Sequence, residues 1–394
     1  MTRHLRTIIL LLSLTLAGTT LADTKYYWVG GLHYAINTDD STAQVVRSGY
    51  YDDITSVSIP ASITVDSITY PVTSLGESCF VYCTKLASVT IPASVRELEA
   101  NCFSHCISLA EIDLPSSVTK MGDRCFNYCT KLRSITIPDS VTELAAFCFA
   151  GCDSLRSIVL PRTLKRIGGY CFAACDSLSD ITIPTSVTEL GRGCFWYCGS
   201  LRSIAIPASV TQIGNCCFGF CTALGSVTIP AQVSALGDSC FMRCTALMSV
   251  TLPAAMTRIG ANCFCECSSL TGITSLAAVP PAWAGAFEDP QTMTLCVPDS
   301  SVDAYKAAPV WSDFAQILPL STTGIRAAQA DHVNMTIAGG LLTLRGVPSG
   351  ELVSVYSADG KLLGTGNGPF RLESQRGRTI IVSIGAHSRK LLVR

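Results

Sequence analysis

The chain has 394 residues, of which 48% are hydrophobic and only 14% are charged, so a large share of it must be buried in one or more folding units. The formal net charge of -1 leaves neither a basic field for nucleic acid nor an acidic tail. With only five histidines, the chain offers little for metal or acid–base chemistry. We therefore expect no nucleic-acid partner and no cofactor.

The first residues have the features of a secretory signal peptide. Arg3 and Arg6 precede an apolar run, residues 8–17, that is too short to span a membrane as a helix. Small residues at Thr20 and Ala22 predict cleavage after Ala22, although a buried N-terminal helix is an alternative. No other segment approaches 18 uninterrupted apolar residues, so we expect an exported chain without a transmembrane segment.

A five-residue motif, Cys-Phe-x-x-Cys, occurs nine times at a constant spacing of 23 residues. Its first cysteines are Cys79, Cys102, Cys125, Cys148, Cys171, Cys194, Cys217, Cys240 and Cys263. Its second cysteines are Cys83, Cys106, Cys129, Cys152, Cys175, Cys198, Cys221, Cys244 and Cys267. A motif that recurs at a fixed period indicates a repeat architecture rather than a single chemical site.

Each 23-residue unit predicts one strand and one short helix. Residues 134–138 alternate polar and apolar side chains up to a proline, which is typical of a short half-buried strand. Residues 125–132 fit one to two turns of helix, with the cysteines and phenylalanine inward and with Asn127 and Tyr128 outward. The predicted fold is therefore an α/β leucine-rich-repeat solenoid of nine units.

The eighteen repeat cysteines have several possible roles. Cysteine is among the most often buried residues and acts there as a small hydrophobe, which is the interpretation we favour. Export also allows disulfides within a motif or between units, and metal binding is a further alternative. Cys216, Cys265 and Cys296 lie outside the two series, and the odd total of 21 predicts at least one thiol that is free or pairs with another chain.

The period breaks at both ends of the array, which divides the chain into segments. We expect a signal peptide at 1–22, an N-terminal β cap with the first repeat strand at 23–78, the solenoid at 79–271, a C-terminal cap at 272–320, a linker at 321–324 and a C-terminal β-sandwich at 325–394. The C-terminal cap is expected to contain a strand that ends at Val297 and an amphipathic segment at 302–314.

The repeat resembles the BspA-like leucine-rich repeats, also called the Treponema pallidum type. The signature is found in Ile137-Pro138, Ser140-Val141, Leu190-Gly191 and Phe126-x-x-Cys129, and the resemblance covers about residues 50–275. The family commonly has alanine before the phenylalanine, whereas this chain has cysteine in all nine units. The resemblance implies a bacterial surface protein involved in adhesion to host matrix proteins and in coaggregation between bacteria.

Residues 325–394 resemble the C-terminal sorting domain of type IX secretion in Bacteroidetes. The similarity lies in Val353–Tyr356 with Asp359-Gly360-Lys361, and in the basic and apolar end Lys390–Arg394. It implies recognition by the type IX secretion machinery and display on the outer-membrane exterior. A generic β domain used for contacts is the alternative.

No catalytic signature is present: the chain has no GxSxG or HExxH motif, and the glycine-rich residues 364–368 fall in an expected hairpin. We therefore expect a binding protein rather than an enzyme. One candidate surface is an aromatic stripe on the expected short helices: Tyr82, His105, Tyr128, Trp196, Tyr197 and Phe220. A second is the polar strand face flanked by Arg133, Arg156 and Arg202. Packing against neighbouring loops and a solvated sheet are the respective alternatives.

The sequence thus predicts a secreted, cell-surface leucine-rich-repeat binding protein, adhesin-like, that recognises host matrix proteins or other bacterial surfaces. The alternatives are a structural component of the envelope and a carbohydrate-capturing surface protein.

Overall fold

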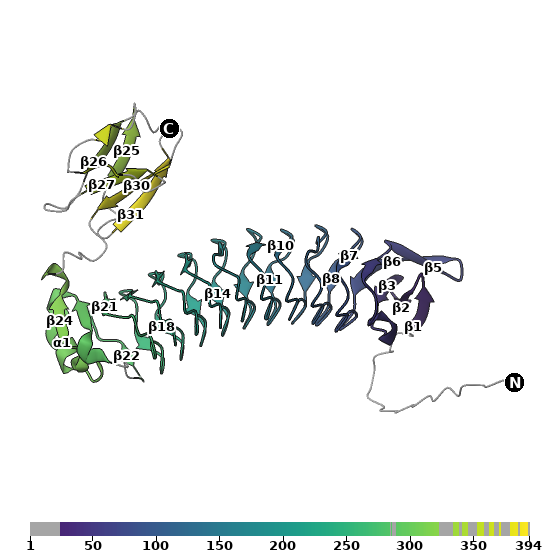
Figure 1. The fold of residues 1–394 in the computed structure, drawn as a ribbon, viewed down its shortest axis with the longest axis horizontal. Coiled ribbons are helices and arrows are strands. Elements are labelled where there is room, and N and C mark those ends of the chain that lie inside the picture. Colours follow the sequence, from purple (N-terminus) through teal and green to yellow (C-terminus); the bar gives the residue numbers. More distant parts are fainter. Residues whose placement is uncertain are drawn as a thin grey trace.

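The computed structural model describes residues 24–283, 285 and 289–322, together with seven strands between residues 334 and 392. The predicted signal peptide lies outside these residues, as do Asp359, Gly360 and Lys361 of the predicted sorting domain. The body of the protein is an elongated solenoid with one 23-residue unit per turn, as predicted (Figure 1).

Two ladders of short strands run along the solenoid. The strand face consists of β4 (Ser56–Ser58), β7 (Ser88–Thr90), β10 (Ser134–Thr136), β12 (Ser157–Val159), β15 (Ser203–Ile204), β17 (Ser226–Val227), β19 (Ser249–Leu252), β21 (Gly272–Ser275), β23 (Thr294–Val297) and β24 (Gln316–Pro319). The charged face consists of β8 (Glu97–Leu98), β9 (Lys120–Met121), β11 (Glu143–Leu144), β13 (Arg166–Ile167), β14 (Glu189–Leu190), β16 (Gln212–Ile213), β18 (Ala235–Leu236), β20 (Arg258–Ile259) and β22 (Ala282–Trp283). Neighbours pair in parallel through the repeat, for example Ser134 with Ser157 and Glu143 with Arg166.

The third side of each unit is a double turn, so the helix expected at the Cys-Phe motif is wrong. The residues just before the two cysteines adopt left-handed backbone conformations in every unit. Before the first cysteine these are Ser78, Asn101, Arg124, Phe147, Tyr170, Gly193, Cys216, Ser239 and Asn262; before the second they are Tyr82, His105, Tyr128, Gly151, Ala174, Tyr197, Phe220, Arg243 and Glu266. Two left-handed residues four positions apart in each unit prevent a right-handed helix from forming there.

Hydrogen bonds explain why the chain accepts these unfavourable conformations. In the unit at residues 124–129, the N–H groups of Phe126 and Tyr128 donate to carbonyls of the next unit at 2.8 and 2.7 Å. The N–H groups of Asn127 and Cys129 instead close local turns. The backbone therefore alternates between turn and ladder, and its polar groups are satisfied along the whole side.

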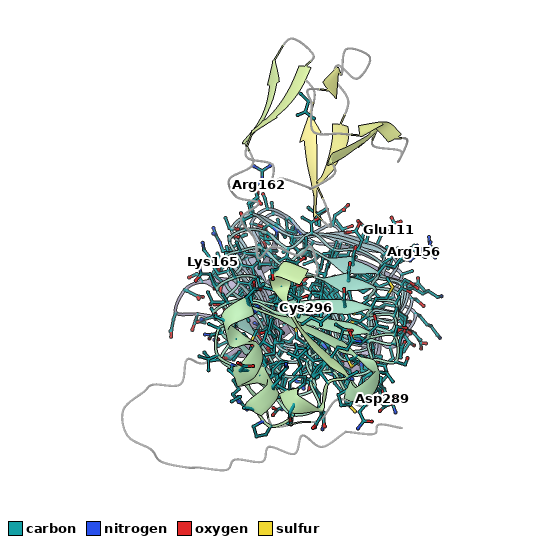
Figure 2. All side chains as sticks on the ribbon, turned by 90° about the vertical axis from the view of Figure 1, so that its left-hand side faces the viewer. Glu111, Arg156, Arg162, Lys165, Asp289 and Cys296 are labelled. Carbon is teal, nitrogen blue, oxygen red and sulfur yellow. The ribbon has the colours of Figure 1, made fainter. Side chains whose placement is uncertain are left out.

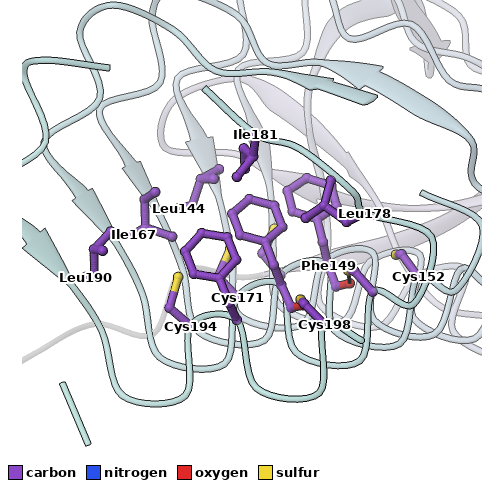
Figure 3. Close-up of a cluster of buried hydrophobic side chains, with 14 of the residues drawn as sticks. Leu144, Phe149, Cys152, Ile167, Cys171, Leu178, Ile181, Leu190, Cys194 and Cys198 are labelled. Atoms are coloured by element: carbon purple, nitrogen blue, oxygen red, sulfur yellow. Dashed lines mark hydrogen bonds between the residues drawn. The ribbon is translucent and has the colours of Figure 1, made fainter. Parts of the chain in front are cut away.

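A column of stacked phenylalanines fills the core. The ring centroids of consecutive units, from Phe80 to Phe264, lie 5.2–5.7 Å apart, as Figure 3 illustrates for part of the column. Tyr51 continues the column at the N-terminal end, and Trp283 and Trp311 continue it at the C-terminal end. Aromatic pairs add about 0.5–1.5 kcal/mol each beyond their buried area, so the column binds each unit to the next.

The two cysteine series line this core as thiols rather than bridges. The sulfurs of Cys79 and Cys102 are 3.5 Å apart, beyond the length of a disulfide bond. In the second series, each thiol from Cys106 to Cys267 donates to the phenylalanine carbonyl of the preceding unit, as Cys152 does to Phe126 at 3.2 Å. The repeat cysteines are therefore buried, as we favoured. In addition, the hydrogen bonds of the second series connect neighbouring units.

The other signature residues contribute to the same register. The Ser209 hydroxyl donates to the Val187 carbonyl of the preceding unit at 2.7 Å. A methyl group at Gly214 would lie 2.6 Å from the backbone nitrogen of Arg192, so the backbones pass too closely there for a side chain. Asn127, which was expected on the outside, is buried and donates to the Ala150 carbonyl at 3.0 Å.

Both ends of the solenoid are covered. The N-terminal cap contains β1 (Lys25–Val29), β2 (Leu32–Asn37), β3 (Thr42–Val45), β5 (Ser62–Val65), β6 (Ile68–Leu75) and the 3-10 turn η1 (Gly49–Tyr51). The C-terminal end contains α1 (Val302–Ala307) and the 3-10 turns η2 (Pro290–Thr292), η3 (Asp299–Ser301), η4 (Trp311–Asp313) and η5 (Leu320–Thr322). Tyr305 and Trp311 are buried there against the last turns of the solenoid. None of the described helices is long and apolar enough to cross a membrane.

The C-terminal segment forms two antiparallel sheets. Its strands are β25 (Asn334–Ala338), β26 (Leu341–Arg345), β27 (Val353–Ser357), β28 (Leu362–Thr365), β29 (Phe370–Arg371), β30 (Thr379–Ile384) and β31 (His387–Leu392). The sheet orders are β25-β26-β29 and β28-β27-β30-β31. The residues that resemble a sorting signal thus include a central strand, β27, and an edge strand, β31.

We expect Gly214→Ala to lower the free energy of unfolding by about 1–3 kcal/mol, because the new methyl group must push two backbones apart. Chemical denaturation measures the loss. Gly225→Ala is the matched control: its methyl group would come no closer than 4.0 Å to any neighbour, and stability should be unchanged. Equal effects of the two substitutions would contradict the close-approach argument.

We also expect the protein to lose stability as the pH rises above about 9. Burial raises the pKa of Cys83 and Cys198 to about 12 from the usual 9.0, and it raises the pKa of Cys175 and Cys221 as well. The unfolded chain ionises its thiols first, so the stabilisation is complete below pH 9 and is lost between pH 9 and the folded pKa. In that range each buried thiol should lower the free energy of unfolding by about 1.4 kcal/mol per pH unit.

Guanidinium unfolding under reducing conditions between pH 7 and 10.5 tests this dependence. A variant with Cys175→Ala, Cys198→Ala and Cys221→Ala should be less stable than the native protein at pH 7. Above pH 9 its free energy of unfolding should fall less steeply with pH, and the difference between the two slopes should be about 4 kcal/mol per pH unit for the three missing thiols. An unchanged slope in this variant would show that the buried thiols do not control the alkaline transition.

Candidate binding surfaces

The turn side of the solenoid presents the first candidate surface, which we call the turn ridge. It consists of the left-handed residues before the two cysteines of each unit, together with Trp196, which follows the phenylalanine of its unit. A left-handed backbone at Tyr82, Tyr128 and Tyr197 accompanies side chains that remain about half exposed, at 55%, 50% and 45%. The predicted aromatic stripe is therefore on the surface, although on turns rather than on helices.

The first three predicted stripe residues form one stack. The His105 ring lies between Tyr82 and Tyr128, with centroid distances of 4.4 and 4.9 Å. Partial burial lowers the pKa of His105, so the stack is neutral at physiological pH. Tyr128 in turn lies over Gly151, where a side chain would collide with the ring. Because these rings cover each other's faces, they present mainly edges and hydroxyl groups to a partner.

The other three predicted residues form a separate cluster further along the ridge. Tyr197 stacks on Phe220 at 4.1 Å, and Trp196 contacts both rings at 5.5 and 5.0 Å. The Arg243 guanidinium lies over Phe220 at 5.1 Å and pairs with Glu266 at 2.6 Å. Tryptophan, tyrosine and arginine held together by mutual contacts are the residue types that dominate binding energy at protein interfaces.

A second group of ridge aromatics was missed from the sequence. Phe147 and Tyr170 stack at 4.9 Å, and Arg124 and Arg192 lie over their outer faces. Phe147 and Tyr170 each directly precede the first cysteine of their unit, so the same 23-residue spacing could have identified them. They occupy the units in which Gly151 and Ala174 leave the predicted stripe without a ring, so ridge aromatics continue across the gap.

The three predicted arginines lie on the strand side. Figure 2 views the molecule along the solenoid, with Glu111 and Arg156 on this flank and Lys165 on the opposite one. Arg156 and Arg202 line a shallow hollow of about 350 Å³ together with small residues, among them Ser177 and Ser200. Among the described residues no ion pair involves Arg133, Arg156 or Arg202, so their charges are available on the surface.

The charged face offers a third candidate surface, a hollow of about 790 Å³, which no residue pattern had suggested. Glu77, Glu99 and Asp123 line it, and an ion pair between Lys120 and Glu97 crosses it. Glu99 is already occupied, since it accepts hydrogen bonds from Gln44 and from the N–H of Glu77. Within the part of the chain that the structure describes, no three His, Cys, Asp or Glu side chains are placed to hold a metal ion.

Comparison with known proteins agrees with this architecture. The repeat pattern of the BspA type leucine rich repeat region matches residues 50–163 and 142–271. A leucine-rich repeat protein from Bacteroides ovatus is 26% identical, over 78% of this chain and 77% of that protein, with a TM-score of 0.61. No curated protein matches the chain significantly.

Two further solved structures are similar in sequence but superpose less well. The Treponema pallidum leucine rich repeat protein is 25% identical over 62% of this chain and 91% of that protein, with a TM-score of 0.39. A leucine rich cell surface protein from Faecalibacterium prausnitzii is 23% identical over 75% of this chain and 94% of that protein, with a TM-score of 0.36. Since the family pattern covers more than half of the chain, the protein belongs to the BspA-type leucine-rich-repeat family.

Proposed function

We propose that the protein is a binding scaffold displayed on the cell surface, adhesin-like in action, that recognises host matrix proteins or the surfaces of other bacteria through its turn ridge. The cluster of Trp196, Tyr197, Phe220 and Arg243 is the observation that carries this proposal. The core column is complete without this cluster, so its partly exposed rings are available to contact a partner as well as to pack on one another.

The backbone of the ridge favours this role. The N–H groups of Tyr197 and Phe220 donate to carbonyls of the next unit, and the Trp196 N–H closes a local turn on the Gly193 carbonyl, so the cluster is held in a fixed geometry before a partner arrives. A partner then orders few side chains on binding, which lowers the entropic cost. With units about 4.8 Å apart, nine units offer a surface roughly 40–45 Å long.

Export and display follow from the two ends of the chain. The basic and apolar leader at 1–22 would direct export, and residues 325–394 would be recognised by the type IX secretion machinery. The solved structure of a similar protein from Faecalibacterium prausnitzii is described as a cell surface protein, which supports the same location here. Within this proposal the protein has no enzymatic role, since binding is the activity that its solenoid supports.

The ridge can be tested by solid-phase binding of the exported chain to immobilised matrix proteins, a glycan array and whole bacteria. We expect Trp196→Ala combined with Tyr197→Ala to weaken saturable binding at least tenfold, or about 1.4 kcal/mol, because the cluster loses its two largest contact surfaces.

Two control variants separate the surfaces. Met248→Ala removes an apolar side chain that is 61% exposed outside the ridge and should leave binding unchanged. A variant with Arg133, Arg156 and Arg202 changed to serine tests the strand face, and selective loss in this variant would move the site there. If the native chain binds none of the partners, the structural role in the envelope is favoured instead.

Export is tested separately by removing residues 325–394 in the native host. We expect the shortened protein to accumulate in the periplasm, whereas the full chain becomes accessible to protease added to whole cells. Unchanged surface exposure of the shortened protein would reject the sorting role and leave a β domain used for contacts.

A further inference from the structure

The two ends of the aromatic column differ. At the C-terminal end the column terminates in Trp311, Tyr305 and Phe314, which are all buried. At the N-terminal end it passes from Phe80 to Tyr51 and then to Trp28, which is 50% exposed. The solenoid is therefore closed by aromatic packing at one end, whereas at the other it leads into exposed rings.

Four rings form this exposed N-terminal group, which we call the cap cluster: Tyr26, Trp28, His33 and Tyr50. Trp28 lies opposite His33 in the antiparallel β1–β2 pair and stacks on it at 5.2 Å and 15°. Tyr26 is two residues along the same strand and contacts His33 at 5.6 Å, on the same face of the sheet. Tyr50, from η1, meets Trp28 nearly at a right angle, at 5.5 Å and 77°.

The hydrophobic core does not need these rings. Tyr26 and Tyr50 are 61% and 81% exposed, although the alternate residues of β1, Tyr27 and Val29, pack against the core. The β1 strand thus uses one face for stability and leaves its other face aromatic. The segment is nevertheless fixed, because the His33 N–H donates to the Tyr51 hydroxyl and Arg47 donates to the Val81 carbonyl at 3.1 Å.

The chemistry of the cap cluster selects one class of ligand. It contains no charged side chain. Near η1, Arg47 is bound to Val81 and Asp53 is paired with Lys85, which leaves the exposed carboxylate of Asp52, the residue after η1, to repel an anionic sugar.

His33 covers one face of Trp28, and Tyr50 stands at 77° to the indole, so the exposed rings are not coplanar. Tyrosine hydroxyls, an indole N–H and an imidazole lie around them. A pyranose ring presents C–H groups on its faces and hydroxyls on its rim, which matches this pattern of apolar faces and polar edges.

We infer that the cap cluster is a binding site for a neutral hexopyranose residue of a glycan, with Trp28 and Tyr50 as the walls of the site. The site lies in the N-terminal cap, outside the nine-unit turn ridge, so the two are separate. A charged sugar would find no counter-charge in the cluster.

The test uses the exported chain on a glycan array with neutral, sialylated and sulfated oligosaccharides, followed by titration of the best neutral oligosaccharide. We expect neutral glycans to bind, with an affinity that changes little with salt. Trp28→Ala and Tyr50→Ala should each weaken binding at least tenfold, whereas Trp28→Phe should retain most of it, because it keeps one aromatic wall.

Matched variants keep the result interpretable. Trp196→Ala, on the turn ridge, should leave neutral-glycan binding unchanged, so failure at the cap and failure at the ridge are distinguishable. Thermal unfolding confirms that the Trp28 variants remain folded. The inference is overturned if no neutral glycan binds, if Trp28→Ala binds as well as the native chain, or if the substitution instead converts a dimer to a monomer in sedimentation.

Discussion

The phenylalanine of each unit lies flat against that of the next, and this contact sets the register on which the rest of the structure depends. Once Phe126 and Phe149 stack at 5.5 Å, the residues on either side are brought into line with their counterparts 23 positions away. The cysteine thiol then reaches the carbonyl of the preceding phenylalanine, and the turn N–H groups reach the carbonyls of the following unit. A shift of one residue would break all three contacts in every unit, so the repeat is held by many small interactions that agree rather than by a few strong ones.

The same register has a consequence for the surface. Left-handed turn residues cost about 1–2 kcal/mol per residue when they are not glycine, and the chain uses tyrosine, phenylalanine and arginine at such positions. Ring stacking between adjacent units offsets part of this cost, as in the pair Tyr197–Phe220. Since the backbone is fixed by the ladder, the identity of a ridge side chain can change from unit to unit without loss of the fold. This arrangement allows a recognition surface to vary on a constant scaffold.

Most of the architecture could be predicted from the 23-residue spacing, because buried positions recur with it. Ile135 and Ile137 are both inward, as the alternation of residues 134–138 indicated. The helix was predicted wrongly because Cys125, Phe126, Cys129 and Leu132 fit an inward helical face as well as they fit two consecutive turns. Backbone hydrogen bonds to the next unit decide between the two, and such bonds leave no mark on hydrophobic spacing. Tyr26 and Trp28 were recognised only as strand residues, since alternation does not say which face of a cap is covered.

The difference between the two ends of the solenoid also bears on how the molecule would meet a partner. A chain attached at its C-terminal segment would hold the buried end, with Tyr305 and Trp311, nearer to the cell, and the cap that carries Trp28 would lie at the far end of the solenoid (Figure 1). Under this proposed attachment, the aromatic closure would lie on the side of the cell, and the exposed rings would lie where a ligand arrives first. A weak contact at the tip would raise the effective concentration of the same partner along the ridge, so two modest sites could hold more firmly than either alone.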